Sequence, residues 1–265
     1  MKAGVENMDY SYHNHTFRCH HASGTPEEYI KRAVENGVKY MGFSEHLPYI
    51  CRDGFQAGYR LSVTDVDDYF EELYVLRDKY KDVIDLKIGF EMECYPELFD
   101  GMLKSAIDYG AEYLILGQHF IVEEHPDGIY VTEGHNKEES MVRYADCVIL
   151  AIKSGCFTYV AHPDAFKFTG EKSIYDREIR RICQTAKDCS IPLEINFLGI
   201  RENRIYPNEG FWKIAGEVGA PVTFGFDAHD IANAYDTKSF ARAYELIEKY
   251  SLNYIGKPNV IILKK

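Results

Sequence analysis

The chain has 265 residues, of which 46% are hydrophobic and 27% charged, values that fit a globular protein with a substantial core. A net charge of −12 argues against a general nucleic-acid binder, and no apolar run approaches the roughly 18 residues needed to cross a bilayer. The first ten residues, MKAGVENMDY, lack the apolar core of a secretion signal, and the seven cysteines form no CxxC pair. We therefore expect a cytoplasmic protein with reduced thiols.

Short β-rich runs alternate with helical patterns along the chain. The predicted strands are residues 9–13, 40–44, 85–91, 112–119, 157–162, 192–196 and 221–227. The predicted helices are residues 25–37, 62–82, 97–110, 137–154, 176–189, 208–219 and 237–250. The first helix has the clearest start, because Thr25 and Glu28 form a capping box around Pro26. The segment 256–265, GKPNVIILKK, is typical of one more strand.

Seven strands alternating with seven helices imply parallel strands joined by crossover helices. A closed or nearly closed α/β barrel, formed by a single domain of residues 1–265, is the simplest arrangement. A doubly wound open sheet is the alternative. No GxGxxG follows the first strand, which disfavours a dinucleotide-binding version of the open sheet.

Residues of metal-binding type stand at the C-terminal ends of the predicted strands, where parallel barrels place their reactive groups. Side chains at positions i and i+2 of a strand point to the same face, so His13 with His15, and Asp227 with His229, can each offer two ligands to one pocket. The candidate ligands are His13, His15, His21, His46, Glu91, His119, His162, Asp227 and His229. Nine ligands of this type require two or three ions of zinc, iron or manganese.

These residues, in this order, resemble the polymerase-and-histidinol-phosphatase (PHP) superfamily. The matching motifs are HNHT (13–16), SEH (44–46), GFEME (89–93), GQHF (117–120), AHPD (161–164) and FDAHD (226–230). The resemblance implies a distorted (β/α)7 barrel with three divalent metal ions at the C-terminal ends of the parallel strands.

The resemblance also implies how the ligands are divided. One metal would be held by His13, His15, Glu91 and Asp227. Glu91 would bridge to a second metal, held with His119 and His162. The third would be held by His21, His46 and His229, with His21 preferred to His20 because a small residue follows it.

The segment 193–207, LEINFLGIRENRIYP, resembles histidinol-phosphate phosphatases in particular. This implies metal-dependent hydrolysis of L-histidinol phosphate to L-histidinol and phosphate in histidine biosynthesis. Arg201 matches the arginine expected at the phosphate, which a planar guanidinium grips through two N–H groups. The other expected substrate contacts are Glu45, Asn196, Arg204 and Tyr206. The expected catalytic residues are the bridging ligand Glu91 and two candidates for the acid, Asp227 and His229.

Three other functions fit parts of the pattern. Another PHP-type phosphoesterase, acting on a nucleotide or phosphotyrosine, is the nearest alternative. An amidohydrolase-like enzyme that cleaves C–N bonds ranks lower, because its bridging lysine would stand where this chain has Gln118 and His119. A non-catalytic metal-binding domain would be expected to have lost ligands, yet all nine positions are filled. The expected partner is a small phosphate monoester, without nucleic acid or membrane, and the sequence predicts no oligomeric state.

Overall fold

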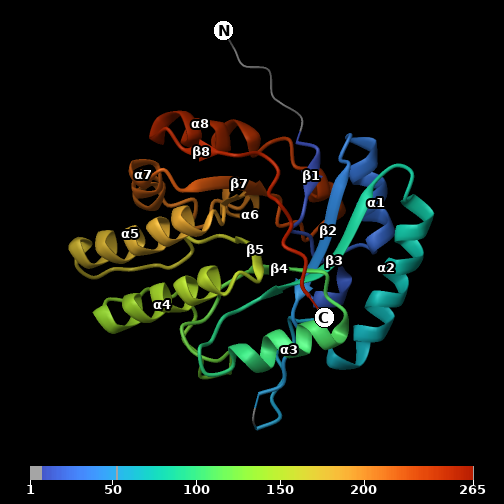
Figure 1. Cartoon of the computed structure of the whole chain (residues 1–265), viewed down its shortest axis with the longest axis horizontal. Coiled ribbons are helices and arrows are strands. Elements are labelled where there is room, and N and C mark those ends of the chain that lie inside the picture. The colour runs from blue at the N-terminus through green and yellow to red at the C-terminus, as the bar shows by residue number, and fades with distance from the viewer. Residues whose placement is uncertain (1–7, 52, 265) are drawn as a thin grey trace.

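The computed structural model describes residues 8–51 and 53–264, so the expectation of no secretion signal falls largely on residues outside this range. One parallel sheet of eight strands runs in chain order and curls into a distorted barrel surrounded by helices (Figure 1). The strands are β1 (Tyr10–Ser11), β2 (Tyr40–His46), β3 (Asp85–Met92), β4 (Tyr113–Leu116), β5 (Phe157–Val160), β6 (Leu193–Asn196), β7 (Pro221–Gly225) and β8 (Asn253–Tyr254). This arrangement confirms the predicted α/β barrel.

Helices cover the outside of the barrel. They are α1 (Pro26–Glu35), α2 (Val66–Tyr80), α3 (Phe99–Tyr109), α4 (Glu138–Ser154), α5 (Lys172–Cys189), α6 (Phe197–Arg201), α7 (Glu209–Val218) and α8 (Phe240–Tyr250). Short 3₁₀ turns are η1 (Phe17–Cys19), η2 (Val63–Asp65) and η3 (Ile231–Tyr235). The predicted capping box of α1 is present, since Thr25 and Glu28 each accept a backbone N–H of the other. No helix within the described ranges is long and apolar enough to cross a membrane.

The barrel closes at the end where its strands finish. Asn14 and Ala228 form a parallel bridge between the segments that follow β1 and β7. Here the His15 N–H donates to the Ala228 carbonyl at 2.9 Å, and the Ala228 N–H donates to the His13 carbonyl at 3.2 Å. At the opposite end β8 pairs with the start of β7. Seven strands therefore enclose the interior, and the closing contact lies directly beside predicted metal ligands.

The extra strand predicted within 256–265 is wrong for the described part of that segment, because β8 ends at Tyr254. The chain after β8 instead crosses the starts of β4 and β5, where the Leu263 N–H donates to the Glu112 carbonyl at 2.9 Å and the Ile261 N–H donates to Thr158 Oγ1 at 3.2 Å. Figure 1 shows this red segment running over the barrel towards the C-terminus. It covers the barrel end opposite to the closing bridge, with isolated contacts in place of a ladder.

A tyrosine fills the barrel interior beneath the strand ends. Tyr113 donates its hydroxyl to the Tyr12 carbonyl at 2.8 Å and lies against two glycines of neighbouring strands. A Cβ at Gly42 would be 2.2 Å from the Tyr113 hydroxyl, and one at Gly89 would be 2.1 Å from its carbonyl oxygen. Only glycine leaves room for this close approach. The barrel interior beneath the strand ends is therefore filled by a packed side chain.

Candidate metal centre

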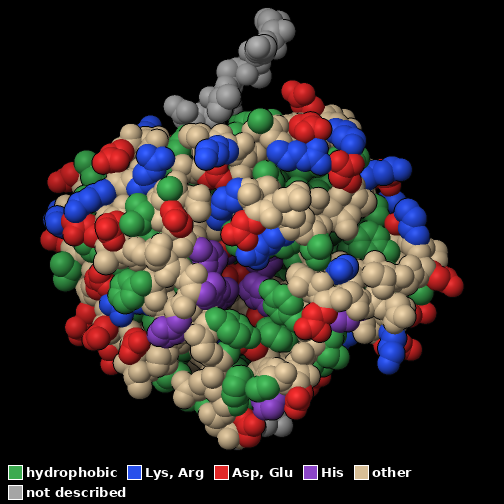
Figure 2. All heavy atoms as spheres, turned by 180° about the vertical axis from the view of Figure 1, so that it is seen from behind, with side chains coloured by type: hydrophobic (Ala, Val, Ile, Leu, Met, Phe, Trp, Pro, Cys, Tyr) green, Lys and Arg blue, Asp and Glu red, His purple; other side chains and the backbone are tan. Residues whose placement is uncertain are grey.

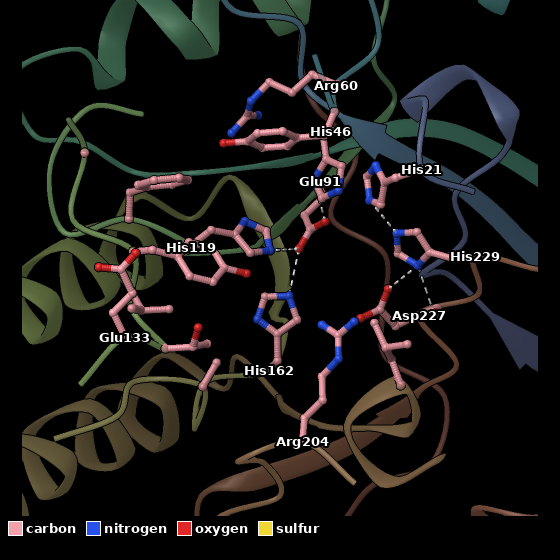
Figure 3. A pocket seen from close by; sticks show the side chains of 18 of the residues that line it. His21, His46, Arg60, Glu91, His119, Glu133, His162, Arg204, Asp227 and His229 are labelled. Atoms are coloured by element: carbon pink, nitrogen blue, oxygen red, sulfur yellow. Dashed lines mark hydrogen bonds and ion pairs between the residues drawn. The ribbon is translucent and has the colours of Figure 1, made fainter. Parts of the chain in front are cut away.

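All nine predicted ligands meet at the C-terminal ends of the strands. Figure 2, which views the face opposite to Figure 1, shows histidine side chains gathered in a central hollow. Figure 3 shows the labelled side chains converging on this hollow from separate strands and loops. The cavity has a volume of about 610 Å³. The ligand-type residues predicted at the C-terminal ends of the strands therefore meet in one site rather than in several.

Glu91, at the end of β3, occupies the middle of the cluster. Its Oε1 lies 2.9 Å from His162 Nε2 and 3.6 Å from His119 Nε2. Its Oε2 lies 3.0 Å from His46 Nδ1 and 3.4 Å from His15 Nε2. Burial alone would raise the pKa of the Glu91 carboxyl, but the surrounding imidazoles outweigh it and hold the pKa well below its usual value. The residue is an ionised carboxylate whose Oε1 faces His119 and His162 and whose Oε2 faces His46, His15 and also His13, at 3.6 Å.

Asp227 follows β7 and faces the same imidazoles from the other side. Its Oδ1 lies 3.2 Å from His229 Nδ1 and 3.5 Å from His13 Nε2. Its backbone has a φ of 46°, in the left-handed region that non-glycine residues rarely adopt. Arg201 fixes this turn by donating to the carbonyls of Phe226, at 2.6 Å, and Asp227. The strained turn is thus held in place where it aims a carboxylate at the cluster.

His21, His46 and His229 form a second part of the cluster near the cavity mouth. His21 Nε2 and His229 Nε2 are 3.0 Å apart, although they are 208 residues apart in the chain. Desolvation lowers the pKa of His21 to about 4, and it also lowers the pKa of His229. Both rings are therefore neutral near pH 7, the state in which imidazole binds metals. The neighbouring His20, with a φ of 64° at the end of η1, belongs to no group of possible metal ligands, whereas His21 does, which favours His21 as the ligand.

Buried polar atoms without hydrogen bonds provide a test of whether a metal fits here. His13 Nε2, His15 Nε2, Glu91 Oε2 and Asp227 Oδ1 are buried and lack a hydrogen-bond partner among the described residues. The separations between these atoms, 3.4 to 3.8 Å, exceed hydrogen-bond length. Two donor atoms each about 2.1 Å from a shared zinc ion, in tetrahedral geometry, would lie about 3.4 Å apart. The donor set therefore fits divalent cations.

Five overlapping triples of donor atoms within 4.8 Å of one another cover all nine predicted ligands. The triples are His13–His15–Glu91, His13–His162–Asp227, His46–Glu91–His119, His21–His46–His229 and His15–Cys19–His229. Glu91 appears in two of them, which suits a bridging ligand. Cys19 was not predicted. Its buried thiol lies among ligand histidines and donates to the Thr16 carbonyl at 3.2 Å.

Carboxylates behind the cluster orient two of the predicted ligand histidines. The Nδ1 of His13 lies 2.9 Å from Glu194, and the Nδ1 of His119 lies 3.0 Å from Glu93. A carboxylate that accepts the Nδ1 proton leaves Nε2 free to bind a metal. Glu93 and Glu194 were not among the predicted site residues. The i, i+2 alternation that places Glu93 on the same face as Glu91 was the available signal.

Glu45, which was predicted to contact substrate, lies behind the predicted ligand His15, as Glu93 and Glu194 lie behind theirs. It is fully buried, it accepts the Thr16 N–H at 2.7 Å, and its other oxygen is 3.7 Å from His15 Nδ1. Asn196 is also buried and donates its amide to Glu194 and Asp227. Neither residue lines the cavity, and the contacts that the structure shows for them lie behind the predicted ligands, so their contact with substrate stays a prediction.

Arg201, the predicted phosphate arginine, also lies outside the cavity lining, and its contact with phosphate stays a prediction. Its guanidinium is used to hold the turn at Asp227. Arg204 and Tyr206 do line it, and Arg204 Nη1 donates to the Tyr206 hydroxyl at 3.2 Å. Figure 3 shows the Arg204 guanidinium reaching between His162 and Asp227. Arg204 is therefore the arginine of this segment that lines the cavity.

A parallel α/β barrel whose strand ends gather imidazoles and carboxylates on the floor of a cavity defines a metal-binding barrel protein. The PHP domain family model matches residues 11–197, which is more than half of the chain. The chain therefore belongs to the PHP domain family, as its motifs predicted.

Curated relatives and solved structures give similar matches. The chain is 25% identical over 224 residues to a probable histidinol-phosphatase of Deinococcus radiodurans, covering 82% of this chain and 85% of the relative. It is 26% identical over 264 residues to the histidinol-phosphatase of Lactococcus lactis, covering 92% and 91%. A crystal structure of histidinol phosphate phosphatase from Lactococcus lactis, complexed with zinc, L-histidinol and phosphate, matches with a TM-score of 0.69 and 20% identity, covering 97% of this chain and 99% of that one. This likeness confirms the fold.

Proposed function

We propose that residues 1–265 act as one metal-dependent phosphatase domain that hydrolyses L-histidinol phosphate to L-histidinol and phosphate. The observation that carries the proposal is the convergence of nine ligand-type side chains on a cavity floor, with Arg204 beside them. Relatives named histidinol-phosphatase, which match over more than four fifths of their length, support the choice of substrate.

We further propose that the site holds three divalent metal ions, of zinc, iron or manganese. The grouping of donor atoms into several triples around the two oxygens of Glu91 supports more than one ion. The zinc in the Lactococcus lactis phosphatase structure supports this class of metal. When bound, such ions lower the pKa of water and neutralise phosphoryl oxygens. We propose that His13, His15, Glu91 and Asp227 hold the first ion, that Glu91 bridges to a second held with His119 and His162, and that His21, His46 and His229 hold the third.

Residues of the chain itself would bind and orient the phosphate. The Arg204 guanidinium is permanently cationic and offers planar N–H donors to phosphate oxygens. Burial raises the pKa of the Tyr206 phenol, so its hydroxyl keeps its proton near neutral pH and can donate to an anion. Glu202 pairs with Arg204 from the outer side, 2.7 Å from Nη2, and orients the guanidinium. Asp227 or His229 as the acid that protonates the leaving alcohol stays a prediction.

The test is a substrate panel run with metal analysis of the purified protein. We expect metal-dependent turnover of L-histidinol phosphate to exceed that of nucleotides and phosphotyrosine by at least about tenfold in kcat/KM, because specificity is a ratio of these values. Glu91→Ala should remove most bound metal and activity, since both carboxylate oxygens face ligand histidines. A panel led by a nucleotide or by phosphotyrosine would assign the site to another phosphoesterase, and full metal content in Glu91→Ala would contradict the bridging role.

The two arginines provide a sharper check within the same assay. Arg204→Ala should lower kcat/KM for L-histidinol phosphate about 10- to 100-fold with unchanged thermal stability, because it removes a charge-assisted phosphate contact from the cavity. Arg201→Ala should lower thermal stability and metal content, because it releases the turn at Asp227. The opposite pattern would return the phosphate contact to Arg201.

A further inference from the structure

The cationic arginines around the cavity are already paired within the described residues. Arg60 lies buried between Glu93 and Glu124, with Nη2 3.0 Å from Glu93. Arg204 is paired with Glu202, and Figure 3 shows its guanidinium between His162 and Asp227, where we propose that the phosphate binds. Neither guanidinium is therefore available to balance another acid in the lining.

The acidic groups of the lining are also assigned, with one exception. Glu91 and Asp227 belong to the ligand set, and the lining His125 is paired with Asp53 at 2.9 Å. Glu133 lines the cavity as well, yet within the described ranges it forms no ion pair and belongs to no group of possible metal ligands. Its side chain is an exposed anionic group at the lining of the cavity, and no cation among the described residues is paired with it.

The backbone around Glu133 is held close to the metal cluster. Two residues earlier, the Val131 N–H donates to the carbonyl of the ligand His119 at 2.9 Å. Two residues later, the His135 N–H donates to the Lys167 carbonyl at 2.8 Å. Two residues of chain span at most about 7 Å. The backbone on both sides of Glu133 is thus held by hydrogen bonds, one of them to the predicted ligand His119.

Figure 3 shows where the Glu133 side chain lies. It stands on the same side of the cavity as His119, across from His21 and His229. Lys167 passes near Gly134, but no ion pair joins it to Glu133. A molecule whose phosphate meets the cluster would therefore present its other end to this carboxylate.

Aromatic side chains form part of the wall of the same cavity. Phe55, Tyr59, Phe120 and Tyr130 line it, and the rings of Phe120 and Tyr130, the latter three residues before Glu133, pack edge to face at 5.2 Å. Such walls suit a planar ring, while an unpaired carboxylate suits a cation. The combination fits an alcohol that carries both an aromatic ring and an ammonium group.

We propose that Glu133 determines specificity by binding the ammonium group of the substrate's alcohol portion. The inference rests on the proposed phosphatase function and adds the residue that distinguishes amino-alcohol phosphates from other monoesters. Glu133 takes no part in breaking the P–O bond. It lowers KM for substrates that carry a cation at this position.

The experiment compares two substrates in the metal-loaded enzyme, L-histidinol phosphate and its analogue without the amine, 3-(imidazol-4-yl)propyl phosphate. In the unaltered chain we expect the aminated substrate to have the higher kcat/KM. Glu133→Gln should reduce that preference about fivefold through KM, with kcat unchanged, because it removes one partly exposed ion pair. Glu133→Asp should retain part of the preference, and Glu133→Lys should reduce it further.

Asp127→Asn serves as the matched control, because it removes one negative charge from the same loop while Asp127 stands outside the lining with a 98% exposed side chain. It should leave the preference unchanged. Equal losses for both substrates in Glu133→Gln, or no loss for either, would overturn the proposal. If the unaltered chain did not favour L-histidinol phosphate over phenyl phosphate, the proposed function would fail instead. The two failures are therefore distinguishable.

Discussion

Gly117 shows how a single missing side chain makes room for the metal cluster. It follows β4, and a Cβ at this position would lie 1.8 Å from Glu91 Oε1. Gly225 does the same for an outer carboxylate, since its Cβ would lie 1.6 Å from Glu194 Oε1. Glu91 and Glu194, the carboxylate that contacts His13, thus each lie directly against a glycine of a neighbouring strand segment.

Replacing Gly117 should therefore act on the metal centre. Gly117→Ala would push the Glu91 carboxylate from its place between His162 and His46, and we expect metal affinity to fall about 10- to 100-fold, as when a supporting contact of a ligand is lost. Isothermal titration of the metal-free protein with zinc measures this directly. Gly101→Ala is the control, since a Cβ at Gly101 meets nothing within 4 Å. Equal zinc affinity in both variants would refute the steric argument.

At the scale of residues, the sequence predicted which ligand-type side chains meet in one site, whereas the substrate contacts stay predictions. The nine ligands follow from one rule, that parallel strands finish at the same end of a barrel. The arginine assignment instead depended on the local path of residues 197–204, where the short helix α6 was not predicted. Because α6 ends at Arg201, that side chain turns back towards β7 and Arg204 reaches the cavity. A motif match alone cannot tell which of two arginines, three residues apart, reaches the cavity.

Among the elements, α7 and α8 are joined by one glutamate. Glu209, in the first turn of α7, accepts from Arg242, Lys249 and Tyr250 of α8, each at 2.7 Å. Their hydrogen bonds, led by that of Lys249, lower the pKa of Glu209 to about 2 from its ordinary value of 4.5. A carboxyl with a lowered pKa in the folded state stabilises the protein above its unfolded pKa and loses that contribution as the pH falls.

The expected result is a pH-dependent effect of Glu209→Gln. Its urea midpoint, measured on metal-free protein, should be lower than that of the unaltered chain at pH 7, and the gap should narrow as the pH falls from 4.5 towards 2. Glu248→Gln on α8 is the control, because Glu248 forms no ion pair with a described cation. A gap that stayed constant with pH would show that Glu209 acts by packing alone.

The other differences between prediction and structure at this scale lie at the edges of elements. The strand predicted for 112–119 ends at Leu116, because the chain must bend there to carry Gly117 past Glu91. The helix predicted from residue 176 begins four residues earlier, at Lys172. The prediction missed its polar first turn, because that turn adds no apolar residue to the amphipathic pattern. Periodicity fixes the middle of an element, whereas its ends depend on contacts made later in the chain.

For the whole molecule, the metal centre joins segments from both ends of the barrel sequence. His13 and Asp227 stand 214 positions apart, yet their donor atoms are 3.5 Å apart beside the closing bridge of Asn14 and Ala228. Ions bound here would connect the first and seventh strands in addition to the backbone contacts. Ligands that bind only the folded state stabilise it by mass action.

Metal removal should therefore lower the stability of the whole fold. Zinc at about 100 times its dissociation constant would contribute about 2.7 kcal/mol per independent site, and each kcal/mol shifts the midpoint by about 2–4 °C at this size. We expect chelation to lower the melting temperature by at least about 5 °C and zinc to restore it, as followed by scanning calorimetry. The Glu91→Ala variant should show little response to zinc, and a full response would argue against metal at this cluster.

The tail that crosses the starts of β4 and β5 has a practical consequence. Figures 1 and 2 view opposite faces, and the chain's last described residues lie on the face away from the histidine-lined opening. A surface anchor attached behind Lys264 would hold the molecule with its opening directed towards the solution. Immobilised on a sensor chip or a bead in this orientation, the protein should remain accessible to small phosphate esters.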